Sequence, residues 1–117
     1  MYLFFWNYDL MNFSNHIGII GSGISGLTLA YALKKIGIDV VLFERSKELS
    51  EYGAGISISR NALKILDHLD LISLLREKSY QPKTVSWKYK NNEFHVTNTD
   101  VFTASRKNLI EVLYVEY

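Results

Sequence analysis

The chain of 117 residues contains no cysteine and a single proline, and it has no excess of charge of either sign. The lack of cysteine excludes disulfides, thiol nucleophiles and thiolate metal sites, and it fits a reducing cytoplasm. With 13 basic and 12 acidic residues the formal net charge is +1, so electrostatics favour neither nucleic acid nor an anionic membrane as a partner. The length predicts one small domain at most.

Several catalytic signatures are also missing from the sequence. No lysine follows the glycine-rich segment, which argues against an ATPase-type phosphate loop, and there is no G-x-S-x-G segment. His16, His68 and His95 do not have metal-ligand spacing. We therefore nominate no catalytic residue and no metal ligand, and the chemistry in view is binding.

The N-terminal segment is rich in aromatic residues and has one charged side chain, Asp9, among residues 1–13. It is too short to span a bilayer and lacks the features of a secretory signal. We expect residues 1–15 to be an N-terminal extension, with translation starting at Met11. An interfacial anchor is the alternative.

The most informative segment is an apolar run, residues 17–20, followed by Gly21, Gly23 and Gly26 with G-x-G-x-x-G spacing. This pattern is typical of a strand, a nucleotide-binding turn and a helix. Gly21 allows the turn, Gly23 leaves space for a pyrophosphate, and Gly26 lets the helix pack closely on the strand. The amides and the positive dipole end of the helix then face the phosphates.

The residues after this turn strengthen the prediction. Gly37 indicates the end of the helix, and residues 40–43 form a second apolar strand that leads to Glu44. Glu44 follows Gly26 by 18 residues, close to the roughly 20 expected for an acid that binds the adenosine ribose. Such an acid disfavours the 2′-phosphate of NADP. Arg45 can contact adenine or phosphate, and the simpler alternative is a solvated side chain. For the motif as a whole, the alternative is an ordinary tight turn with Glu44 solvated.

The rest of the chain predicts further elements around this βαβ unit. We expect an extended run over residues 53–59, where the glycines suggest close approach to a strand or a ligand. Ser59 should cap a helix over residues 61–69, and a shorter helix should cover residues 71–78. Alternation then predicts a β-hairpin with one buried face, a turn at Asn91-Asn92 and His95 on the polar face. A final helix is expected over residues 104–114.

Three pieces of this sequence resemble the single-component FAD-dependent aromatic-ring monooxygenases of the para-hydroxybenzoate and salicylate hydroxylase type. They are the glycine turn with Glu44-Arg45, the segment from Gly53 through Gly55 to the Asn61-Ala62 pair, and the R-x-x-L helix that starts at Arg106. Departures are small: Arg60 stands where the family usually has proline, and Asp70 where glycine is common. The large departure is that the later family motifs and the substrate-binding sheet are absent.

The resemblance implies a fold and a cofactor. The fold would be α/β, a Rossmann-like βαβ FAD-binding unit with an added hairpin and helices, so that residues 16–117 form a partial FAD-binding domain without the substrate domain. The implied cofactor-binding residues are Gly21, Gly23, Gly26, Glu44, Arg45, Gly55 and Arg106. Arg106 suits this role because a guanidinium pairs well with a pyrophosphate.

The implied activity is NAD(P)H- and O2-dependent hydroxylation of an aromatic or similar small molecule, and we do not expect catalysis by the fragment alone. The partners implied are FAD and, in a full-length relative, a small aromatic substrate, without nucleic acid, metal or membrane span. The isolated chain should expose a strand edge and apolar helix faces and be marginally stable. Alternatives are a fragment of another FAD- or NAD-dependent oxidoreductase and a non-catalytic nucleotide-binding module.

Overall fold

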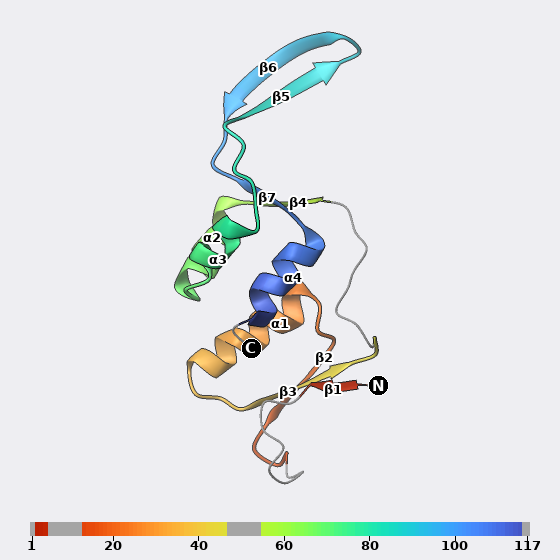
Figure 1. Ribbon diagram of the computed structural model, residues 1–117, viewed down its shortest axis with the longest axis vertical. Helices are drawn as coiled ribbons and strands as arrows, with labels where there is room; N and C mark the ends of the chain where they lie inside the picture. Colours follow the sequence, from red (N-terminus) through yellow and green to blue (C-terminus); the bar gives the residue numbers. More distant parts are fainter. Residues whose placement is uncertain (1, 5–12, 47–54, 116–117) are drawn as a thin grey trace.

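The computed structural model describes residues 2–4, 13–46 and 55–115. The predicted start at Met11 and the contacts of Gly53 and Ala54 lie outside these ranges. The described chain is elongated, with principal extents of 62 × 27 × 20 Å. A small sheet lies at one end, helices fill the middle, and a β-hairpin projects from the other end (Figure 1).

The predicted βαβ unit is present. Strand β2 (Ile17–Ile20) leads through the glycine turn to helix α1 (Ile24–Lys35), and the chain returns in strand β3 (Val40–Glu44). β2 and β3 pair in parallel from Ile17↔Val40 to Ile20↔Phe43. The carboxyl ends of two parallel strands lie at the same sheet edge, so this pairing brings the glycine turn and Glu44 together.

Helix α1 ends where the sequence predicts. The amide of Gly37 donates to Lys34 O (2.9 Å) and that of Ile38 to Leu33 O (3.0 Å), and Gly37 has a φ of 78°. These two bonds form a Schellman motif, whose left-handed position favours glycine. The Lys35 side chain, in the last turn, bonds to His68 O and to Asp70 Oδ2 (2.7 Å). The end of α1 is thereby tied to the loop after the next helix.

The sheet contains one strand that the sequence did not predict. Strand β1 (Tyr2–Phe4) pairs antiparallel with β3, with the register Tyr2↔Glu44 to Phe4↔Leu42, and the strand order is β1-β3-β2. This order leaves β2 at an edge of the sheet.

The expectation that residues 17–20 form a buried strand is confirmed only for Ile19. Ile19 is buried beneath α1, whereas Ile20 is 90% exposed and Ile17 is also exposed. Successive strand residues point to opposite faces. Only the α1 side of β2 is covered by described residues, so Ile20 on the other side faces solvent. The predicted open strand edge is that of β2, and apolar helix residues such as Leu29 and Ile65 are exposed as well.

A second, two-stranded ladder forms from strand β4 (Gly55–Ile58) and strand β7 (Phe102–Ser105), which pair antiparallel. β7 was not predicted: the expected final helix starts at residue 106 instead of 104, because Ala104 and Ser105 belong to this ladder. Helix α4 (Arg106–Val115) follows directly. The Asn108 amide donates to Ser105 Oγ (3.0 Å), so Ser105 caps the helix.

The two predicted middle helices are confirmed as helix α2 (Arg60–His68), preceded by Ser59, and helix α3 (Ile72–Glu77). Between them Asp70 has a φ of 61°, a left-handed conformation in which aspartate is tolerated but glycine is favoured. Their apolar faces join α1, α4 and both ladders in one core, which contains Ile19, Leu27, Ala30, Leu42, Ile58, Leu66, Leu69, Leu71, Leu75, Phe102, Ala104, Leu109, Ile110, Val112 and Leu113.

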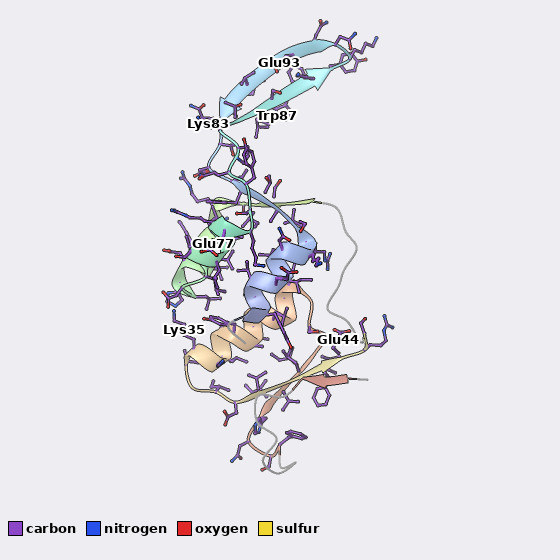
Figure 2. All side chains as sticks on the ribbon, in the orientation of Figure 1. Lys35, Glu44, Glu77, Lys83, Trp87 and Glu93 are labelled. Atoms are coloured by element: carbon purple, nitrogen blue, oxygen red, sulfur yellow. The ribbon has the colours of Figure 1, made fainter. Side chains whose placement is uncertain are left out.

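The hairpin of strand β5 (Thr84–Tyr89) and strand β6 (Asn92–Asn98) exists, but it has no buried face. It projects away from the helices, and Trp87 and Glu93 lie far from Lys35 and Glu44 (Figure 2). The turn lies at Lys90-Asn91, not Asn91-Asn92, since Tyr89 pairs with Asn92.

The side-chain faces of the hairpin also differ from the prediction. His95 lies opposite Trp87, with ring centroids 5.1 Å apart, whereas Val96 lies opposite Ser86. The apolar side chains are therefore divided between both faces, and His95 is not on a separate polar face. The register shift between Trp87 and Lys88 was not predictable from alternation alone.

Candidate functional site

The glycine turn joins β2 to α1 through a geometry that requires two of its glycines. Gly21 has a φ of 95°, and its amide donates to Phe43 O (2.7 Å). A Cβ atom on Gly26 would lie 1.9 Å from Gly21 O, an impossible overlap with backbone. Glycine at residue 26 therefore lets α1 start directly against the turn, as predicted.

Gly23 has a different role from Gly26. A Cβ atom built on Gly23 would meet nothing within 4 Å, so the protein itself does not require glycine there. Gly23 is the N-cap of α1, which has no side-chain cap hydrogen bond and no acidic residue in its first turn. The first helical bond runs from Leu27 N to Gly23 O (2.9 Å), so the amides of residues 23–26 precede it. This is the geometry of an anion site.

The Glu44 side chain lies at the mouth of this turn, at the end of β3 (Figure 2). Its Oε2 accepts hydrogen bonds from the Ser22 amide (2.8 Å) and from Ser22 Oγ (2.9 Å). Its Oε1 accepts from the Ser46 amide (2.8 Å). The carboxylate therefore bridges the turn and the chain after β3.

These donors hold Glu44 in its ionised form. The Ser22 amide, then the Ser46 amide and the Ser22 hydroxyl, lower the pKa of Glu44 from 4.5 to about 2, with a smaller contribution from the Arg45 amide. Hydrogen bonds to the charged form outweigh the opposing effect of partial burial. At neutral pH Glu44 can only accept hydrogen bonds, which suits ribose hydroxyls and repels a phosphate.

Gly55 lies at the start of the second ladder, and Arg106 begins α4 directly after the ladder's other strand. Gly55 pairs with Ser105, and Arg106 is the next residue along the chain. A Cβ on Gly55 would lie 3.8 Å from Ala104 O, an ordinary contact, so of the two predicted neighbours, a strand or a ligand, the structure shows the strand, β7. The Nε atom of Arg106 is buried without a hydrogen-bond partner, although the residue takes part in another interaction.

An apolar cavity of about 260 Å³ lies between residues that follow the glycine turn, Gly55 and Arg106 in the chain. It is lined by Ile24 at the start of α1, by Ile56 next to Gly55, and by Leu109 one turn after Arg106. The fold thus gathers the starts of α1, β4 and α4. Arg45 is different, because its side chain is exposed beside Glu44 and has no described contact with the turn.

Residues 19–54, which include the glycine turn and Glu44, match a family described as an NAD(P)-binding Rossmann-like domain. The FAD-dependent monooxygenase pynG of Aspergillus niger is 41% identical over 78 residues, which is 67% of this chain and 18% of that protein. The tetrameric form of 2-methyl-3-hydroxypyridine-5-carboxylic acid oxygenase superimposes with a TM-score of 0.80 at 31% identity, over 85% of this chain and 28% of the other. The chain is therefore similar to part of the FAD-dependent monooxygenases, and the similarity extends over less than a third of the length of each of these two proteins.

One of the similar solved structures contains bound FAD. Klebsiella pneumoniae HpxO, complexed with FAD and uric acid, superimposes with a TM-score of 0.74 at 25% identity, over 86% of this chain and 28% of the other. The chain spans about a fifth of the length of the curated relatives it matches. The resemblance inferred from the three motifs is confirmed at the level of the family.

Sequence reasoning missed the two serines that fix Glu44. Ser22 is the buried polar residue of the described chain, 3% exposed, and it lies between the first two glycines of the motif. Its place in the motif was a signal, since a hydroxyl there lies near the end of the neighbouring strand. Ser46 acts through its backbone amide, which no side-chain pattern reveals. The described residues form no metal-binding cluster and include no helix long and apolar enough to cross a membrane.

Proposed function

We propose that this chain binds the adenosine diphosphate half of FAD and forms the nucleotide-binding part of a flavoprotein monooxygenase. The observation that carries the proposal is the ionised Glu44 carboxylate at the mouth of a glycine turn whose helix amides have no side-chain cap. The turn suits the pyrophosphate, and the carboxylate suits the ribose.

The residues present fit this group. Gly26 is required by the protein backbone, but Gly23 is not, since a side chain there would meet only open space. An open glycine next to uncapped helical amides is what close approach of a pyrophosphate needs. Two independent features, shape and charge, therefore favour the same ligand.

The other predicted cofactor-binding residues are Arg106, Gly55 and Arg45, which lie outside the glycine turn. Arg106 starts α4, and the Leu109 and Ile56 side chains near it share a cavity with the start of α1. We propose that Arg106 pairs with the pyrophosphate and that the backbone at Gly55 lies along the flavin. We propose that the exposed Arg45 side chain contacts the adenine.

When bound, FAD supplies the redox chemistry, accepting hydride from NAD(P)H and activating oxygen. The chain's own residues bind the nucleotide half and orient it. We propose that the complete protein hydroxylates an aromatic or similar small ring, as the names of its relatives suggest, and that it acts in the cytoplasm. Hydroxylation by these 117 residues alone is not expected, because about four fifths of the length of the relatives is not represented.

Binding of FAD, ADP and NAD to the purified chain, measured by calorimetry, tests the proposal. FAD and ADP should bind, and Glu44→Gln should weaken both because it removes the charge that the ribose hydroxyls meet. Glu93→Gln makes the same chemical change on the distant hairpin and should bind as the wild type does. Equal affinities in all three proteins would refute the assigned role of Glu44.

NAD is the second candidate ligand, favoured by the description of the family that matches residues 19–54. It shares the adenosine diphosphate half with FAD. Stronger binding of NAD than of FAD would favour an NAD-dependent oxidoreductase. Equal binding of FAD, NAD and ADP would show that only the shared half is held.

A further inference from the structure

The hairpin of β5 and β6 has a face that carries aromatic side chains and no lysine, arginine or acidic residue. Val85, Trp87 and Tyr89 alternate along β5, so their side chains lie on this face. The register shift leaves its extra residue in β6 and does not interrupt the alternation in β5. His95 lies opposite Trp87 and Thr97 lies opposite Val85, so both belong to the same face. We call these five residues the aromatic face.

The other face of the hairpin is charged. Lys88 and Glu93 lie opposite each other and form an ion pair, with 3.7 Å between Nζ and Oε2. A charged side and an uncharged aromatic side are typical of a sheet whose aromatic side is covered. Trp87 and Tyr89 are nevertheless 44% and 68% exposed, because the hairpin projects away from the described helices (Figure 1). The described residues therefore leave the aromatic face open.

We propose that the aromatic face packs against the same face of a second copy of this chain, related to the first by a two-fold axis. A lone hairpin is marginally stable in water, and a second layer on its apolar face stabilises it. The net charge of +1 per chain does not oppose association. Lys90 Nζ lies in the turn, 5.4 Å from the Tyr89 ring centroid. Antiparallel packing of the two hairpins places the two copies of Lys90 at opposite ends of the interface.

The size of the aromatic face predicts a weak dimer. Since an aromatic side chain has about 150–250 Å² of surface, the exposed parts of Trp87 and Tyr89 together supply about 250 Å². With the three smaller side chains the face offers about 400 Å² per copy, half of the roughly 800 Å² in a standard interface. We expect a dissociation constant on the order of 100 μM. Unfolding measured far below that concentration reports the monomer, with the hairpin exposed.

Sedimentation velocity of the full chain, over a concentration range that spans the expected dissociation constant, tests the inference. The weight-average sedimentation coefficient of the wild type should rise from that of a monomer toward that of a dimer. Thr97→Lys keeps every aromatic side chain but adds a cation to each aromatic face. It should weaken the dimer by at least about tenfold, because like charges then meet in the interface. If Thr97→Lys does not fold, Trp87→Lys places the cation on the same face.

Ser86→Lys is the matched control, because Ser86 lies on the charged face of the hairpin, opposite Val96. It adds the same cation and should dimerise as the wild type does. A wild type that stays monomeric at every concentration overturns the inference, as does equal weakening by Thr97→Lys and Ser86→Lys. A monomer whose tryptophan emission shifts to the blue on phosphatidylcholine vesicles also overturns it, and assigns the face to lipid. These outcomes leave the proposed function standing, because the aromatic face contains no residue of the nucleotide site.

Discussion

Gly26→Ala is the substitution with the most direct structural consequence. The added Cβ would lie 1.9 Å from Gly21 O and 3.1 Å from Gly21 C, and both are backbone atoms that cannot rotate away. Overpacking costs about 1–3 kcal/mol, and a clash with backbone belongs at the upper end. Replacing a helical glycine by alanine returns about 1 kcal/mol. We expect a net loss of about 2 kcal/mol in the free energy of unfolding.

Gly23→Ala separates stability from binding. Its Cβ meets nothing within 4 Å, so the change in stability should stay within about 1 kcal/mol, the usual range for an N-cap. Nucleotide binding should nevertheless be lost, because the methyl group occupies the space proposed for the pyrophosphate. Urea unfolding and ADP calorimetry on both variants measure the two effects. Wild-type stability of Gly26→Ala, or wild-type binding by Gly23→Ala, would refute the reasoning.

Three further predictions use other parts of the fold. In the folded state the pKa of Glu44 is lowered from 4.5 to about 2, so the ionised carboxylate contributes stability that is present above pH 4.5 and is lost as the pH falls toward 2. Urea unfolding across this range should show a free energy of unfolding that depends on pH, and Glu44→Gln should reduce this dependence. An unchanged pH dependence in Glu44→Gln would contradict the prediction. Asp70 combines a φ of 61° with an ion pair to Lys35. Melting temperatures should therefore fall in the order Asp70→Gly, Asp70→Asn, Asp70→Ala, with alanine lowest because it has neither the backbone freedom of glycine nor a polar side chain. Equal melting temperatures for the glycine and alanine variants would contradict this prediction. Replacing residues 84–98 by a short turn should leave the urea midpoint of unfolding unchanged, because the hairpin is exposed and the Thr99 amide already donates to Lys83 O (3.1 Å). A large drop in the midpoint would show that the hairpin stabilises the rest of the fold.

The part of the site that the sequence predicts is local in the chain. Gly21, Gly26, Gly37 and Glu44 were predictable because each has a backbone or spacing requirement within one βαβ unit. The structure brings Glu44 to the turn through parallel pairing of adjacent strands, which the pattern of apolar runs already implied. Ser22 was not nominated, because its role depends on a hydrogen bond to a residue that lies across the sheet edge.

The features that the sequence did not predict are long-range. β7 was included in a helix because Ala104 and Ser105 suit a helix, and pairing with β4 overrode that preference. Ile20 was expected to be buried because apolar runs usually are, but its exposure depends on whether another element covers the face of the sheet opposite α1. The hairpin faces were misjudged because a register shift at Trp87 moves the later side chains relative to simple alternation.

The central claim is that the glycine turn and Glu44 together bind the adenosine diphosphate half of FAD. Titration of the ¹⁵N-labelled chain with ADP, followed by amide chemical shifts, tests it most directly. The account predicts that the largest changes lie at residues 22–26 and 44–46, with smaller changes at residues 105–106. Saturable binding with the largest changes on the hairpin or at the end of α1 would contradict it, as would no change at the turn.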